Sequence, residues 1–173
     1  MPEADRVRAA ADPRPANNAE SDPAEVLRRY GRELADAVDQ VIESWVLRCV
    51  RTRWSQFHDV ELPPQLSAEA TQVATVARRE VGAELRSLLG SDLDAQRNGP
   101  LSVLRAAVRF PTALLRAAGV APVVRDAFAE RAFPLDVYDL SPAAFADIDP
   151  SLHEPGLHWG AAKAHAALQR RRT

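Results

Sequence analysis

The chemically reactive side chains of this 173-residue chain gather near its C-terminal end. Imidazole and carboxylate groups are what zinc or a non-haem metal binds, and they also serve as general acids and bases. His158 and His165 are seven residues apart, so they would share one face of a helix. A metal site here would use His153, His158 and His165. The whole reactive segment comprises Asp136, Asp139, Asp147, Asp149, His153, Glu154, His158 and His165.

The spacing of these residues matches no established metal or catalytic signature. There is no H-E-x-x-H motif, and Pro155-Gly156 falls where a helical site would need an unbroken helix. The chain also lacks a phosphate-binding glycine loop, a G-x-S-x-G elbow and a paired C-x-x-C. We therefore predict no cofactor, and we favour turn-shaping and capping roles for Asp147 and Asp149. A metal-dependent or acid/base enzyme built on residues 136–165 is kept as an alternative.

Residues 133–156 form an irregular Pro/Asp-rich segment that also carries aromatic side chains. Tyr138 and Phe145 lie in it, and Trp159 follows it. Aromatic residues would attach a long loop to its domain, and this is the interpretation we favour. The alternative is a recognition loop, because long connections often carry function and aromatic residues are common at interfaces. A binding site in this region would use Tyr138, Asp147, Asp149 and Trp159.

The charges of the C-terminal half are sorted into two consecutive blocks. Residues 95–125 contain five arginines and no acid, whereas residues 126–154 contain seven acids and only Arg131. This pattern favours electrostatic pairing of the two blocks inside the molecule. The alternative is a basic surface that binds an acidic partner protein. Because such a surface would form on helices, its candidate contacts are Arg105, Arg109 and Arg116.

Two other kinds of partner fit the basic block less well. Nucleic acid is disfavoured by a pI of about 6.1 and by a single lysine, Lys163. A membrane surface fits better, because residues 100–118 combine apolar and basic side chains as an interfacial helix does. A helix buried in a protein core shows the same pattern, so peripheral membrane binding through residues 100–118 is a third hypothesis.

Composition points to a cytoplasmic and bacterial protein. Cys49 is the only cysteine, so no intrachain disulfide can form and a reducing compartment is expected. Residues 1–18 lack the apolar region of a secretory signal, and no stretch approaches the roughly 20 apolar residues of a membrane span. The strong excess of arginine over lysine is typical of GC-rich bacterial genomes.

The elements that carry these residues are predicted to be helices. The first runs from Pro23 to Phe57, with Asp22 as its N-cap and apolar residues at three- and four-residue steps. At about 50 Å it would exceed the roughly 40 Å diameter of a compact domain of this size. It must therefore bend near Gly31 or protrude, and a protruding apolar end predicts pairing with a second copy as a homodimer.

The remaining helices follow from proline, glycine and capping signals. A second helix capped by Ser67 ends at Gly90 and forms an antiparallel hairpin with the first. A third begins at Pro100, kinks at Phe110-Pro111 and stops at Gly119. Further helical segments are expected at residues 122–132, at a short turn starting at Ser141-Pro142, and at residues 156–171.

The sequence therefore predicts an all-α bundle of five to six helices with a long first helix. Residues 1–20 should be a disordered N-terminal arm, because they lack periodicity, and residues 21–173 a single helical domain. The function that we favour is a non-catalytic binding or regulatory role through protein–protein contacts, either with a second copy or with an acidic partner.

Overall fold

The computed structural model describes residues 22–91 and 99–172, and within these ranges every regular element is a helix. The all-α prediction is therefore confirmed. The predicted N-terminal arm, residues 1–20, lies outside the described residues, as do Arg97 and Asn98.

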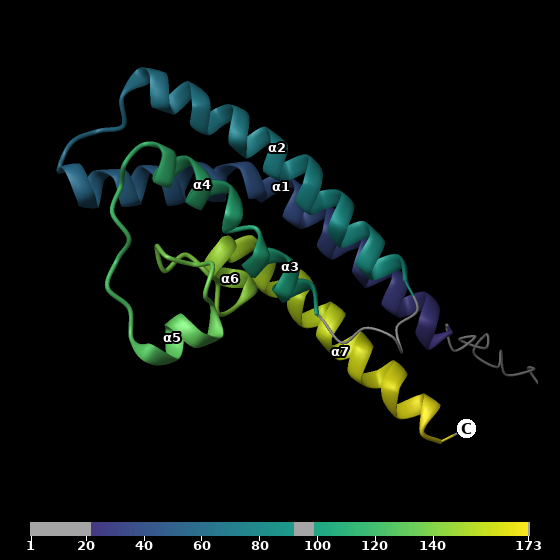
Figure 1. Cartoon of the computed structure of the whole chain (residues 1–173). Helices are drawn as coiled ribbons and strands as arrows, with labels where there is room; N and C mark the ends of the chain where they lie inside the picture. Colours follow the sequence, from purple (N-terminus) through teal and green to yellow (C-terminus); the bar gives the residue numbers. More distant parts are fainter. Residues whose placement is uncertain (1–21, 92–98, 173) are drawn as a thin grey trace, which may run out of the picture.

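Helices α1 (Pro23–His58) and α2 (Pro64–Gly90) form the predicted antiparallel hairpin, which runs the length of the molecule (Figure 1). The start of α1 is as expected, because Asp22 accepts a hydrogen bond from the Ala24 N–H at 3.0 Å. Its end is fixed by Asp59, which adopts a left-handed φ of 56° and donates its N–H to the Ser55 carbonyl.

The apolar side of α1 is covered within the chain, by α2 along the hairpin, by α4 (Arg109–Ala117) and by α7 (His153–Arg170). Leu34, Val38 and Ile42 are at most 1% exposed. Helix α1 is continuous through Gly31, where a Cβ would lie 3.4 Å from the Leu89 Cβ of α2. Gly31 thus permits close helix packing. Most of the apolar stripe of α1 is covered by α2, α4 and α7, although Phe57 near its C-terminal end is 47% exposed.

The start of α2 differs from the prediction. The helix begins at Pro64, and Ser67 lies inside it with its N–H bonded to the Pro63 carbonyl. Ser67 is therefore not the cap. Proline fits the first helical position because its fixed φ is helical and the N–H that it lacks would have had no partner there.

The next two helices are α3 (Pro100–Ala106) and α4 (Arg109–Ala117). They are separated at Ala107 and Val108 instead of at Phe110-Pro111 as predicted. Pro111 is still the cause, because it has no N–H to donate to the carbonyl four residues earlier, that of Ala107. The Phe110 N–H bonds to that carbonyl instead, at 3.1 Å, which tightens the chain into a turn. Gly119, with φ of 79°, follows the end of α4 as expected.

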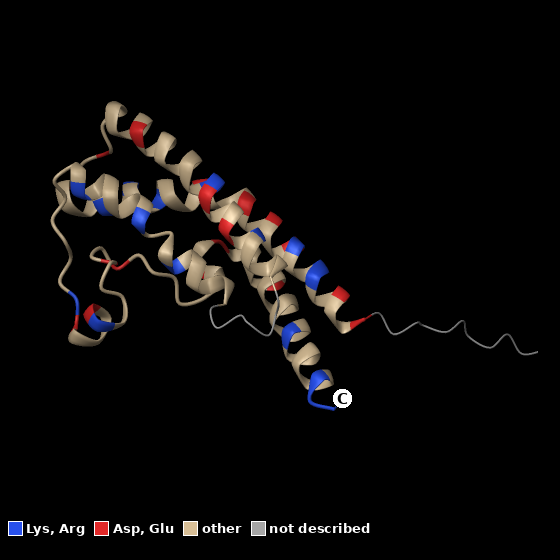
Figure 2. Ribbon diagram, turned by 45° about the vertical axis from the view of Figure 1, so that its right-hand side comes forward, with Lys and Arg blue, Asp and Glu red and all other residues tan. Residues whose placement is uncertain are grey.

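Residues 121–135, which we call the outer loop, stand away from the helical body (Figures 1 and 2). The helix predicted over 122–132 is reduced to α5 (Ala127–Ala132), because residues 120–126 are not helical. The Val123 N–H instead bonds to the Val137 carbonyl at 3.1 Å, which joins the outgoing and returning segments of the chain. Asp126 caps α5 by accepting from the Ala129 N–H at 2.7 Å.

The chain ends in α6 (Phe145–Ile148), the 3-10 helix η1 (Pro150–Leu152) and α7 (His153–Arg170). The helical turn expected at Ser141-Pro142 is wrong, since α6 begins at Phe145. The last helix starts at His153, before the predicted residue 156. Pro155 lies in its first turn, where a missing N–H breaks no helical hydrogen bond, so Pro155-Gly156 does not interrupt α7.

Replacing Gly156 by alanine should destabilise the fold. A Cβ at residue 156 would lie 3.0 Å from Cγ of Phe145 and would push its ring out of place. Overpacking of this kind costs about 1–3 kcal/mol of unfolding free energy, measured by urea denaturation. Gly160 in the same helix has nothing within 4 Å of such a Cβ, so Gly160→Ala should be neutral or stabilising by up to about 1 kcal/mol. Equal stability of the two variants would contradict this account.

Candidate binding site

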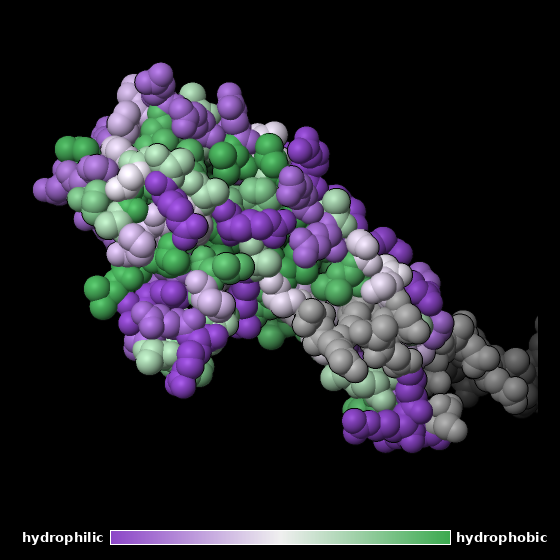
Figure 3. All heavy atoms as spheres, viewed as in Figure 1, coloured by the Kyte–Doolittle hydropathy of each residue, from purple (hydrophilic) through white to green (hydrophobic). Residues whose placement is uncertain are grey.

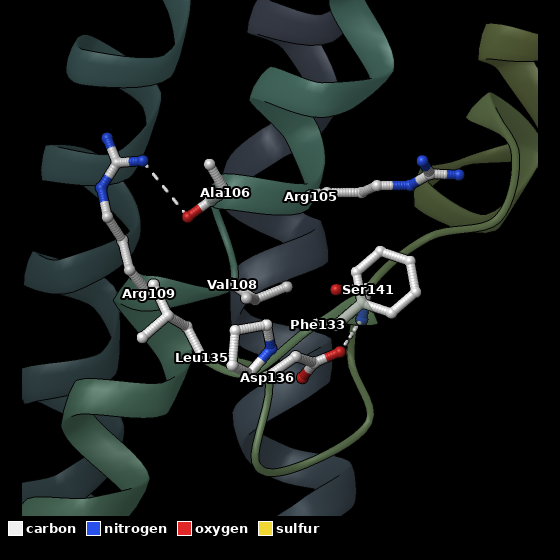
Figure 4. Close-up of a pocket in the computed structure, with 9 residues that line it drawn as sticks. Arg105, Ala106, Val108, Arg109, Phe133, Leu135, Asp136 and Ser141 are labelled. Atoms are coloured by element: carbon white, nitrogen blue, oxygen red, sulfur yellow. Dashed lines mark hydrogen bonds between the residues drawn. The ribbon is translucent and has the colours of Figure 1, made fainter. Parts of the chain in front are cut away.

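A pocket of about 280 Å³ lies between the α3–α4 break and the returning end of the outer loop (Figure 4). Because the break turns the chain, side chains from both short helices face residues 133–136 across the pocket. Asp136 and Ser141 add polar groups, while Arg105 and Arg109 flank it. Its apolar walls are formed by Ala106, Val108, Phe133, Pro134 and Leu135.

The guanidinium of Arg105 is directed toward the chain that precedes α6. Its Nε donates to the Pro142 carbonyl at 3.0 Å and its Nη2 to the Ala143 carbonyl at 3.5 Å. The same group lies 5.5 Å from the ring centre of Phe133. Arg105 therefore holds the returning chain against α3, and its methylene groups line the pocket.

Arg109 points to the opposite side, toward α2 (Figure 4). Its Nη2 lies 3.8 Å from a carboxylate oxygen of Glu80 and 3.6 Å from one of Glu84. Its Nη1 donates to the Ala106 carbonyl at 3.2 Å. The side chain is 42% exposed, so these ion pairs are solvent-screened and each contributes about 0–1 kcal/mol.

The predicted ion pairing of the basic and acidic blocks is wrong. Among residues 99–172 no salt bridge joins an arginine of 95–125 to an acid of 126–154. Arg105 and Arg125 reach the second block through its main-chain carbonyls, and Arg109 pairs with α2. The physical reason is that acids of the second block are occupied by backbone N–H groups, as shown next.

Asp136 is the buried acid of the site, with 3% of its surface exposed. Its carboxylate accepts from the Leu140 N–H at 2.8 and 2.9 Å and from the Ser141 N–H at 2.6 Å. These bonds close the turn that carries one wall of the pocket. Sequence reasoning placed Asp136 among the reactive groups but not among the site residues, because an aspartate before a proline-rich turn is a weak signal.

Asp147 and Asp149 have the capping roles that we favoured. Asp147 accepts from the N–H groups of Ala143 and Ala144, both at 2.8 Å, at the start of α6. Asp149 accepts from the Ser151 N–H at 2.9 Å, and hydrogen bonding by Ser151 lowers the pKa of its carboxyl. Neither aspartate lines the pocket.

The outer loop is held at its base by buried contacts. Tyr138 is fully buried and donates its hydroxyl to the Val120 carbonyl at 2.6 Å. Burial raises the pKa of this phenol, and the positive charge of Arg116 opposes the rise. Arg125 donates from Nη1 to the carbonyls of Ala129 at 3.3 Å and Phe133 at 2.8 Å. The loop therefore has a defined conformation although it stands away from the body.

Beyond this base, the outer loop exposes large apolar side chains. Val124 is 101% exposed, Phe128 71% and Leu135 78%, and α5 buries no residue. In the view of Figure 3, hydrophobic side chains reach the surface on the part of the body next to the outer loop. The sequence prediction, a helix over 122–132, did not indicate that Val124 and Phe128 would be exposed.

The remaining predicted site residues lie elsewhere. Arg116 is exposed on α4, and Trp159 is 7% exposed in the core with Lys163 Nζ 4.9 Å from its ring centre. His153, His158 and His165 are exposed along α7. His153 and His165 are separated by about 18 Å of helical rise. In the described part of the chain no three His, Cys, Asp or Glu residues are placed to hold a metal ion.

The apolar side of residues 100–118 faces inward. The apolar residues buried there are Pro100, Val103, Leu104, Ala107, Val108, Pro111, Leu114 and Leu115. They are therefore unavailable to a lipid surface in this conformation. Within residues 22–91 and 99–172, none of the helices has the length and apolar character that crossing a membrane requires.

Comparison with protein-family models, with curated proteins and with solved structures gave no match.

Replacing Asp136 by asparagine should loosen the turn beside the pocket. An amide presents one acceptor oxygen and a donor NH₂, so one of the bonds to Leu140 and Ser141 is lost. Loss of an acceptor for these partly buried N–H groups costs about 1–3 kcal/mol, measured by thermal unfolding and by faster exchange of the two amides. Asp139→Asn is the matched control, because this residue is exposed and its φ of 55° suits asparagine. The control should stay within about 0.5 kcal/mol of the parent. Equal losses in both variants would refute the assigned role.

Tyr138 should make stability fall at alkaline pH. The pKa of Tyr138 is raised in the folded state. Its contribution to the free energy of unfolding is therefore complete below the ordinary tyrosine pKa of about 10, and it is lost as pH rises through the pKa of the folded state. In a Tyr30→Phe background, which leaves Tyr138 as the sole tyrosine, absorbance at phenolate wavelengths should show a midpoint above about 10. A midpoint at or below that value would contradict the burial argument.

Proposed function

We propose that the protein is a non-catalytic helical binding protein, with a regulatory role, that acts through contacts with other protein chains. The outer loop and the adjoining pocket form its interface. The single observation that carries this proposal is the exposure of Val124, Phe128 and Leu135 on a loop whose backbone is fixed by a buried hydrogen bond of Tyr138 and a partly buried one of Arg125.

Exposed apolar residues are informative only when they are grouped and held in place. A disordered loop would lose conformational entropy on binding, whereas this loop is already ordered by Tyr138 and Arg125. The pocket beside it is small and apolar with arginines at its edge. Aromatic, aliphatic and arginine side chains around a dry centre are characteristic of protein–protein interfaces.

The arginines favour a partner with acidic residues around an apolar group. Arg105 and Arg109 are both partly exposed, and the Arg109 ion pairs are longer than 3.5 Å. A carboxylate of a partner would gain charge-assisted hydrogen bonds there. The setting that we propose is a bacterial cytoplasm, which the arginine-rich composition and the lone buried Cys49 support.

The interface is tested by Phe128→Asp with Leu168→Asp as its matched control. Both side chains are exposed, 71% and 55%, so neither change should alter the unfolding midpoint. Immobilised parent protein should retain specific proteins from native cytosol, and Phe128→Asp should retain at least about tenfold less, as loss of an interface hot spot implies. The Leu168 variant should behave as the parent. If both variants retained the same proteins in the same amounts as the parent, the proposed interface would be wrong.

A further inference from the structure

We infer that the occupant of the pocket is the outer loop of a second copy of this chain, with Phe128 of each protomer inserted into the pocket of the other. This inference rests on the proposed function and names its partner. It differs from the sequence prediction of pairing through α1, whose apolar side is covered within the chain.

The α5 part of the outer loop is complementary to the pocket but does not line it in the same chain. Phe128 is not among the residues that line the pocket and is 71% exposed, so it does not fill the pocket of its own chain. A volume of about 280 Å³ is at the lower limit of small-molecule sites and suits one or two apolar side chains. Phenylalanine offers the largest apolar group on α5.

Charge complementarity supports the same occupant. Phe128 lies between two exposed acids of the outer loop, Asp126 and Glu130, whereas the pocket is flanked by Arg105 and Arg109. Insertion of Phe128 would bring acids of one copy to arginines of the other. The acidic and basic blocks, which form no salt bridge inside the described chain, would then pair between copies.

Reciprocity makes this contact stronger than a single insertion. In a two-fold dimer the loop of each copy meets the pocket of the other, so one binding event forms two identical contacts. The second contact forms within the complex and profits from a high effective concentration. A small patch can therefore sustain a dimer that it could not sustain alone.

The chain suits disulfide mapping of this dimer, because its only cysteine is buried. Burial raises the pKa of Cys49 to about 12, which leaves almost no reactive thiolate near neutral pH. Ala127→Cys places a thiol beside Phe128 without removing it, and Ala106→Cys places one in the pocket wall. Mixed under mild oxidation, the two variants should form a 106–127 disulfide between chains, identified by mass spectrometry.

The matched control is the same mixture with Leu168→Cys in place of Ala127→Cys. It should give at least about tenfold less disulfide, since random collision is its only route. Each variant oxidised alone should also give little product, because a two-fold dimer places residue 127 near residue 106 and not near itself. Equal yields in test and control mixtures would overturn the inference.

Sedimentation provides the second, independent measurement. The parent should shift from monomer to dimer between about 1 and 100 µM, and Phe128→Asp should raise the dissociation constant at least tenfold, about 1.4 kcal/mol. A parent that stays monomeric over this range overturns the second-copy assignment. If the Phe128→Asp variant then still fails to retain the cytosolic proteins that the parent retains, the proposed function stands with a different partner. If it retains all of them, the proposed function and the second-copy assignment both fail.

A double variant, Ala106→Cys/Ala127→Cys, tests whether the pairing is reciprocal. A ladder of disulfide-linked oligomers would show head-to-tail contacts and would overturn reciprocal pairing.

Discussion

The burial of one apolar stripe of α1 is the interaction on which the rest of the structure depends. Its core residues are at most 8% exposed, and α2, α4 and α7 all pack on it. Each fully buried Leu, Ile or Val contributes about 1.5–3 kcal/mol through removal of apolar surface from water. Small residues let these helices approach, as Gly31 does opposite Leu89. The short elements of the C-terminal half take their positions from this surface.

Polar side chains in the C-terminal half form hydrogen bonds with backbone groups at the ends of short helices and at turns. Aspartates accept backbone N–H groups where α5, α6 and η1 begin, while Arg105 and Arg125 donate to carbonyls where the chain turns. In a short helix a large share of the backbone N–H and C=O groups have no hydrogen-bond partner within the helix, so side chains must supply partners. The segregated charges of the sequence therefore act mainly on the backbone. This explains why opposite blocks lie close together without forming salt bridges with each other.

The outer loop joins these features to function. Its base is rigid because Tyr138 and Arg125 bind main-chain carbonyls, and within residues 22–91 and 99–172 nothing covers Val124 and Phe128 at its far end. The exposed apolar side chains of the outer loop have an unfavourable hydration free energy. Binding would remove this cost, because burial of Phe128 and Val124 takes apolar surface out of water. The adjoining pocket exists because Pro111 breaks the α3–α4 helix and turns residues 105–109 toward the returning loop.

The amino-acid sequence by itself determined the helical class, the hairpin of α1 and α2, the stop at Gly119 and the capping roles of Asp147 and Asp149. These depend on local properties: the period of apolar residues, the conformations open to proline and glycine, and short-range hydrogen bonds. Only the tertiary structure decided that Val124 and Phe128 are exposed, that Asp136 is buried, and that Arg105 and Arg109 flank one pocket. An apolar residue in a sequence looks the same whether or not another segment covers it, and a charge does not reveal whether it will meet a side chain or a carbonyl. Those outcomes depend on contacts between residues far apart in the chain, which local patterns do not encode.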